Sequence, residues 1–269
     1  MKRYHLLMTA TLLILMSLGC SDGGNDGDSS NPTPTVNKAA NLRATGASAN
    51  DILSNTNFTK LQIEIGYVTG FRPTDSAIED FVAFLRKHTF KNDIEVLFNE
   101  LPSPGKSVLT LQEIADLETE NRTAYNNGQT LAVYIYFADA PSDGDDEESN
   151  KVTLGAVYRN TSMVIYERTI RRLAARSFAI SNSDAETATL NHEFGHLFGL
   201  VNLGTVAIND HEDPEAANHC IVDGCLMRAE LRFGAGFAKF MESRSAKGLA
   251  VIPELDPECV LDLQGNGGR

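Results

Sequence analysis

The sequence predicts a single α/β (α+β) domain built on a twisted, mostly parallel or mixed sheet. Apolar residues recur at a spacing of two along 60–68, which is typical of a strand, and at helical spacing along 76–88. The nearly continuous apolar run 130–138 is typical of a strand that is buried on both faces. Strands and helices therefore alternate along the chain, as they do in α/β folds.

Three capping boxes, in which a Ser or Thr is followed three residues later by Glu, mark the starts of helices. They are Ser76–Glu79, Thr110–Glu113 and Ser183–Glu186, and the helices are expected to end near His88, Asn126 and Leu200. Five strands are expected, over 60–68, 93–98, 130–138, 154–158 and 163–166. The C-terminal part is expected to be mostly irregular or helical, with a last helix that begins near 253–259.

The chain of 269 residues is acidic, with 23 Lys and Arg against 36 Asp and Glu and a formal net charge of -13. A phosphate backbone requires a basic protein face, so this balance argues against nucleic acid as a partner. It also disfavours electrostatic adsorption to anionic lipid. The composition indicates an acidic globular domain, and it carries no indication of the oligomeric state.

The N-terminal residues predict a secreted, lipid-anchored protein. Lys2 and Arg3 precede an apolar run at 6–18 that is short for a membrane span and suits the core of a signal peptide. The run ends in Ser-Leu-Gly-Cys, which resembles the bacterial lipobox, with Cys20 as the lipidated residue. An ordinary signal peptide with a chance cysteine is the alternative.

This organisation divides the chain into three parts. A lipoprotein signal peptide is expected at 1–19, a flexible tether rich in Gly, Ser, Asp and Pro at 20–36, and the globular domain at 37–269. The expected location is the bacterial cell envelope, at the outer membrane or the cell surface, with Cys20 as the only membrane attachment.

The residues that carry chemistry are concentrated in the helix expected at 183–200. Its sequence from His192 to His196 is His-Glu-Phe-Gly-His, and side chains four residues apart share one helix face, so the two histidines can bind one Zn²⁺. Glu193 is placed to act as the general base towards a zinc-activated water. Gly199 completes an HExxHxxG pattern and permits a left-handed turn that returns a further ligand to the metal.

The HExxHxxG pattern resembles the signature of the metzincin zinc peptidases, and the segment His-Cys-x4-Cys-x-Met that begins at His219 resembles the archaemetzincin branch. The resemblance implies a metzincin-like single catalytic domain with His192, His196 and His219 as zinc ligands. It also implies that Glu193 is the catalytic base, that Met227 lies in a turn beneath the metal, and that the substrates are peptides or proteins.

The chain departs from the family pattern at the third histidine, which normally stands three residues after the glycine. Asn202 occupies that place, and residues 203–218 form an apparent insertion before His219. A carboxamide is a poor zinc ligand compared with an imidazole, so we expect His219 to complete the site. His211, within the insertion, remains the alternative third ligand.

Cys220, Cys225 and Cys259 remain once Cys20 is set aside. An odd number of cysteines in an oxidising compartment predicts one disulfide and one thiol, and their spacing does not favour a particular pair. The alternative is a three-cysteine metal site with one borrowed ligand. Archaemetzincins complete a structural zinc site with further downstream cysteines, of which this chain has only one, so a four-thiolate site cannot form.

Together these observations predict a lipid-anchored zinc endopeptidase. The alternative is a non-catalytic, zinc-containing surface lipoprotein that binds an envelope or host partner. Glu193 discriminates between the two, because a protein that only binds a partner has no need of a carboxylate beside the metal.

Overall fold

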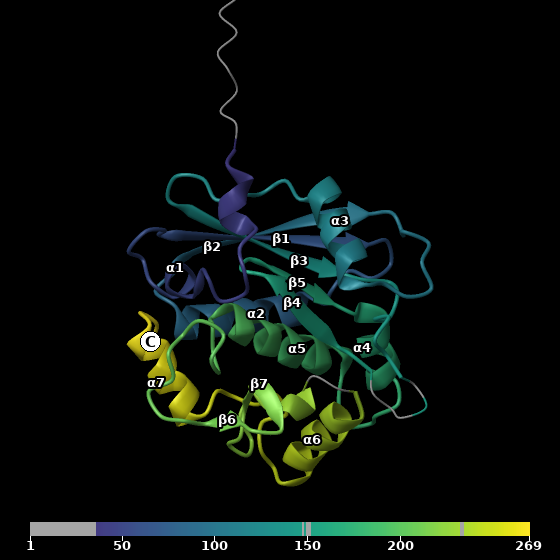
Figure 1. Cartoon of the computed structure of the whole chain (residues 1–269). Helices are drawn as coiled ribbons and strands as arrows, with labels where there is room; N and C mark the ends of the chain where they lie inside the picture. Colours follow the sequence, from purple (N-terminus) through teal and green to yellow (C-terminus); the bar gives the residue numbers. More distant parts are fainter. Residues whose placement is uncertain (1–35, 147, 149–151, 232–233) are drawn as a thin grey trace, which may run out of the picture. The chain divides into compact units, whose positions relative to one another are not determined.

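A five-stranded sheet forms the centre of the protein (Figure 1). The computed structural model describes residues 36–146, 148, 152–231 and 234–269, so the predicted signal peptide and Cys20 lie outside the described residues, as does the tether up to residue 35. The strands are β1 Lys60–Val68, β2 Asp93–Leu101, β3 Thr130–Phe137, β4 Gly155–Arg159 and β5 Ser162–Ile165. Their order is β2-β1-β3-β5-β4, and all neighbours are parallel except β4 and β5. The predicted α/β fold class is confirmed.

Among the residues that the structure describes, seven α-helices accompany this sheet, and some of them pack on each of its two faces. They are α1 Ala49–Leu53, α2 Asp75–His88, α3 Leu111–Asn121, α4 Glu167–Ala174, α5 Asn182–Leu197, α6 Gly234–Ala246 and α7 Pro257–Gly265, with 3-10 helices at Lys38–Asn41 and Ala229–Leu231. Helices α2 and α5 pack on one face, where Ile63 and Val133 join one apolar core. Helix α3 packs on the other face, where Tyr134 joins a second core. Strand β3 contributes to both cores, as its apolar run predicts.

Two of the three helix caps differ from the prediction. Thr110 and Glu113 form the expected capping box of α3. Helix α2 is capped by Thr74 rather than Ser76, and α5 by a box of Ser181 and Asp184 rather than by Ser183 and Glu186. Glu186 is buried and accepts a hydrogen bond of 2.8 Å from the backbone N–H of Thr74. Its carboxylate therefore ties α5 to the start of α2 instead of capping its own helix.

Helix α3 ends five residues earlier than the sequence indicates. Arg122 leaves the helix with extended backbone angles, and the backbone N–H groups of Thr123 and Ala124 donate hydrogen bonds of 2.9 and 2.6 Å to Glu64. Glu64 lies on β1 and is buried. A buried carboxylate requires such partners, so the sheet side chain determines where the helix stops.

The C-terminal part covers the side of α5 that faces away from the sheet (Figure 1). It contains a small hairpin, β6 Glu212–Asp213 and β7 Ala216–Cys220, followed by α6 and α7. The helices agree with the prediction, while the hairpin arises from the segment predicted as an insertion. Within the part of the chain that the structure describes, no helix is both long and apolar enough to cross a membrane.

Candidate metal centre

Three buried histidines from distant parts of the chain meet at α5. His192 and His196 lie one helical turn apart, and His219 comes from β7. One nitrogen atom of each ring lies within 4.8 Å of the others, and the ring centroids are 4.9, 5.4 and 5.2 Å apart. The exposed fractions of the three residues are 0%, 6% and 3%. The structure therefore brings together the three histidines that the sequence indicates as ligands.

The chain leaves α5 through a turn that requires glycine. Gly199 has a φ of 74°, a left-handed conformation that L side chains rarely adopt. A Cβ atom at this position would also lie 2.8 Å from the backbone nitrogen of Thr205. Both observations agree with the sharp turn that the HExxHxxG pattern predicts.

Asn202 occupies the position of the family's third histidine, and its side chain bonds to the hairpin instead. Its amide donates a hydrogen bond of 2.6 Å to Glu212, and the other carboxylate oxygen of Glu212 accepts one of 2.6 Å from the backbone N–H of Asn218. These hydrogen bonds, the one from Asn218 first, lower the pKa of Glu212. The Glu212 carboxylate thus links the residues at the start and at the end of the inserted segment. His219 is the residue directly after Asn218.

The turn that contains Met227 supports the histidines. The carbonyl of Leu226 accepts a hydrogen bond of 2.8 Å from Nδ1 of His192, and the carbonyl of Met227 accepts one of 2.8 Å from the backbone N–H of Cys220. Met227 packs against Gly195, where a Cβ atom would lie only 2.3 Å from its sulfur. The turn therefore approaches α5 closely because the helix has a glycine at this position.

These hydrogen bonds prepare the histidines for a metal ion. Nδ1 of His219 likewise donates to a carbonyl, that of Ala217, at 2.9 Å. Since a carbonyl can only accept, Nδ1 carries the hydrogen in both His192 and His219, and a neutral ring then offers its Nε2 lone pair. Three buried imidazoles, which bind metal ions in their neutral form, are a donor set that suits Zn²⁺.

Glu193 lies beside these histidines in a cleft of about 220 Å³. The cleft is lined by Glu193, His196 and His219 and by Gly155 to Val157 of the edge strand β4. Glu193 is 2% exposed, and a Cβ atom at Gly155 would lie 2.6 Å from its Cγ and 3.0 Å from its Oε1. Gly155 therefore provides the space that the carboxylate occupies. Gly155 was not among the residues predicted for the site, although a glycine at the start of a predicted strand is a recognisable signal of close approach.

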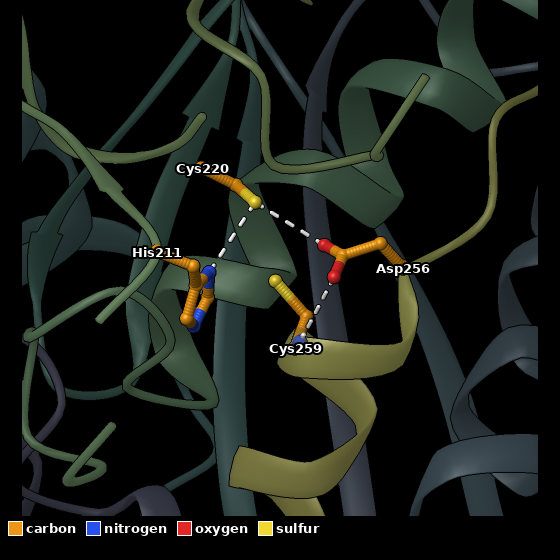
Figure 2. Close-up of side chains that lie close together, drawn as sticks. All are labelled: His211, Cys220, Asp256 and Cys259. Atoms are coloured by element: carbon orange, nitrogen blue, oxygen red, sulfur yellow. Dashed lines mark hydrogen bonds between the residues drawn. The ribbon is translucent and has the colours of Figure 1, made fainter. Parts of the chain in front are cut away.

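The three cysteines form a second group together with His211 rather than a disulfide. Cys220, Cys225 and Cys259 are all free and buried, so the predicted disulfide is not present among the described residues. Hydrogen bonds from the thiols of Cys225 and Cys259 lower the pKa of Cys220. His211 contacts Cys220 through Nδ1 at 3.3 Å, so the structure places the alternative third ligand in this second group (Figure 2).

Two carboxylates near the cysteines were not foreseen. Asp256 contacts Cys220, and Asp262 contacts His211. Asp256 precedes Pro257 and caps α7, a pattern that the sequence does display. Asp262 lies inside α7, and only the fold brings it to His211, so no local signal identifies it.

The fold and the site together define a mixed α/β protein that holds three buried histidines beside a buried glutamate. No protein-family model matches the chain, and no curated protein matches it. Among solved structures, the chain is similar to archaemetzincin from Methanopyrus kandleri, with 15% sequence identity and a TM-score of 0.48. The similarity covers 77% of this chain and 96% of the archaemetzincin chain.

Proposed function

We propose that the protein is a zinc-dependent endopeptidase of metzincin type, with Glu193 as its general base. The observation that carries the proposal is the meeting of His192, His196 and His219 with this carboxylate in one cleft. The imidazoles form a zinc-binding set, and the carboxylate is the group that hydrolysis needs in addition.

The roles of the individual groups follow from their positions. A bound Zn²⁺ supplies Lewis-acid chemistry, which polarises the scissile carbonyl and lowers the pKa of a water towards about 7. Glu193 accepts the proton of the attacking water and delivers it to the departing amine. The carbonyls of Leu226 and Ala217 keep the rings of His192 and His219 oriented throughout.

The edge strand β4 supports a peptide as the substrate. It lies at the end of the strand order and pairs with β5 on one side, and its residues Gly155, Ala156 and Val157 line the cleft. An extended peptide can add to such an edge through main-chain hydrogen bonds. This arrangement would hold a peptide bond next to Glu193 without requiring a particular side chain.

The test is cleavage of a peptide library by the purified protein and by its Glu193→Gln variant. The amide is nearly the same size as the carboxylate but cannot accept the proton. We therefore expect unchanged zinc content in the variant and a loss of activity of at least about 100-fold. If both proteins bind zinc and neither cleaves any peptide, the non-catalytic surface lipoprotein becomes the better description.

We also propose that the enzyme is attached to the bacterial cell envelope, at the outer membrane or the cell surface, through lipid on Cys20. The support is the apolar run at 6–18, the lipobox-like residues that follow it and the polar tract after them. The polar tract after Cys20 would then hold the catalytic domain beside the membrane, and the domain itself would not enter the bilayer.

A further inference from the structure

A cavity of about 240 Å³ lies where helices α2 and α5 pack together, and the segment 252–254 forms a further part of its wall. The two helices lie side by side on one face of the sheet (Figure 1). None of the residues that line this cavity lines the cleft that contains Glu193. The cavity is therefore a separate hollow, which the proposed peptidase activity does not use.

Three buried polar side chains in the wall of this cavity have an atom without a hydrogen-bond partner among the described residues. The atoms are Nδ1 of His88, Oγ1 of Thr187 and Oδ1 of Asn191. The three residues are 3%, 1% and 5% exposed. Native proteins leave few buried polar atoms unpaired, because each one costs free energy, so three of them in one cavity wall indicate a bound group.

Each of these three atoms can accept a hydrogen bond. The amide oxygen of an asparagine only accepts, and a threonine hydroxyl both donates and accepts. Burial lowers the pKa of His88 to about 4, and the charge of Lys87 adds to the shift, so the ring is neutral at pH 7. The hydrogen bond of the ring to the backbone of Arg269 opposes the shift, and a bond with that effect is one that the ring donates. Nε2 therefore carries the hydrogen, and the unpartnered Nδ1 keeps its lone pair.

The exposed part of the cavity wall carries charge. Asp80 and Glu254 are exposed carboxylates, and the exposed ammonium of Lys87 forms an ion pair of 2.8 Å with Glu254. Two carboxylates and one ammonium leave a net charge of -1 on the lining, because the His88 ring is neutral. This charge favours a cation as the ligand.

We propose that this cavity binds a small primary alkylammonium ion. An ammonium group has three N–H donors and no acceptor, so it matches the three acceptors of the wall. A carboxylate ligand would have no hydrogen to share with Oδ1 of Asn191, and the charge of the lining would repel it. The cavity is smaller than the roughly 300–1,000 Å³ of sites for drug-sized molecules, so it suits a short alkyl chain, with Phe84 and Ile252 as apolar contacts.

The wall of the cavity is linked to the three-histidine site. The carbonyl of Glu254 accepts a hydrogen bond of 2.8 Å from the backbone N–H of Leu226, whose own carbonyl accepts one of 2.8 Å from Nδ1 of His192. Two hydrogen bonds therefore connect the cavity wall to a proposed zinc ligand. Binding of the amine itself requires neither zinc nor catalysis, so the proposal stands whether or not the protein cleaves peptides.

The experiment titrates the full-length protein with n-butylammonium at pH 7 and follows the histidine ring signals by NMR and the heat of binding by calorimetry. His88→Gln identifies the signal of His88. n-Butanol, which has the same alkyl chain and no charge, is the matched control ligand. We expect saturable binding of one butylammonium per chain with a shift of the His88 signal, and binding of n-butanol that is at least about tenfold weaker. The absence of a saturable shift at His88, or equal binding of n-butanol, would mean that the cavity holds only water and would overturn the proposal.

Four variants test the position of the ligand. Thr187→Val keeps the shape of the side chain and removes one acceptor, so the affinity should fall by about tenfold. Asp80→Asn removes one charge from the lining and should lower the affinity by about threefold. Glu79→Gln, next to it in α2 and outside the lining, is the control and should bind as the wild type does. Lys87→Gln should raise the affinity, because it removes a competing positive charge and frees Glu254.

Equal weakening in Glu79→Gln and Asp80→Asn would show that the amine responds only to the overall charge of the protein and would overturn the site, as would unchanged affinity in Thr187→Val. The comparison of the two ligands on the wild type tests the proposal without any variant. Binding of butylammonium by a protein that cleaves no peptide would support the cavity site and contradict the peptidase. Cleavage without such binding would support the peptidase and contradict the cavity site.

Discussion

Gly155 determines how much space the Glu193 carboxylate has. A methyl group at this position would lie 2.6 Å from Cγ of Glu193, closer than the two groups can approach. We expect Gly155→Ala to displace the carboxylate and to lower kcat by about tenfold to a hundredfold, as small misplacements of catalytic groups do. Zinc content should be unchanged, because none of the three histidines is affected. Steady-state kinetics together with metal analysis provides the measurement.

Gly144→Ala is the matched control for this substitution. A Cβ atom there would meet nothing nearer than the hydroxyl of Ser142 at 3.7 Å, an ordinary contact. Its kcat should equal that of the wild type. If kcat of Gly155→Ala also equals that of the wild type, the position of the Glu193 carboxylate does not depend on the space at Gly155.

The assignment of the third ligand can be tested at His219. Removing one of three imidazoles should weaken zinc binding at the three-histidine site by at least about 100-fold and abolish cleavage in His219→Ala. The measurement is competition with a chelator, followed by an activity assay. His211→Ala should keep the zinc ion of the three-histidine site, because His211 contacts Cys220 and Asp262 instead.

Asn202→Gly is the control for the position that the family pattern assigns to the third histidine. Glycine accepts the φ of 66° at this residue, so only the amide contact to Glu212 is lost. Zinc should remain bound in this variant. Full activity in His219→Ala would instead move His211 into the role of third ligand.

At the scale of elements, local patterns predicted the strands and helix α5 well. Alternation along 60–68 and the apolar run 130–138 correspond to β1 and β3 within one residue. The errors occurred where a side chain has a distant partner: Glu186 bonds Thr74 on α2, and Glu64 binds the backbone that ends α3. Such partners depend on the packing of elements, which no local window of sequence contains.

The same distinction applies to the site. His192 and His196 could be predicted because helix geometry alone puts them on one face. The position of His219 depends on a turn, on the 16-residue inserted segment and on a hairpin. Only the resemblance indicated this position from the sequence. From the sequence, a metal site with three cysteines and one further ligand was an alternative, but nothing in the sequence identified His211 as that ligand. The contact of Asp262 with His211 depends on the docking of α7 and could not be predicted.

A pair of carboxylates between α4 and α5 predicts how stability depends on pH. Glu167 is fully buried, and burial together with the nearby Glu186 raises its pKa to about 9, although Arg171 opposes the shift. The folded state thus keeps its proton at pH values where the unfolded chain, with a pKa near 4.5, has lost it. The contribution of Glu167 to stability should therefore be greatest below pH 4.5 and fall as the pH rises towards 9.

Denaturant unfolding of the wild type and of Glu167→Gln at pH 6 and pH 8 measures this contribution. The amide cannot ionise, so the variant should lose less stability than the wild type between the two pH values. Glu79→Gln, on the exposed face of α2, is the control and should behave as the wild type. An identical pH dependence in Glu167→Gln and the wild type would contradict the raised pKa.

For the whole molecule, the predicted anchor and the globular domain should be separable. Residues 36–269 form one compact unit, so a change at Cys20 should not affect its folding. We expect Cys20→Ala to lose lipid and leave the membrane fraction while it retains zinc and activity. Mass spectrometry and membrane fractionation test this, with Ser30→Ala in the tether as the control. Lipid on the Cys20→Ala protein would contradict the lipobox assignment.

The hairpin that carries His219 also restricts how the length of the chain can vary. His219 and Cys220 are consecutive, yet they belong to different groups, because successive side chains of a strand project to opposite faces. Adding or deleting one residue within β7 would exchange the two faces and direct a sulfur at the histidines and an imidazole at the thiols. Residues gained or lost in the stretch 203–210, which contains no member of either group, would not cause this inversion. We therefore expect relatives of this protein to vary in length there and to keep the spacing from His211 to Met227 constant.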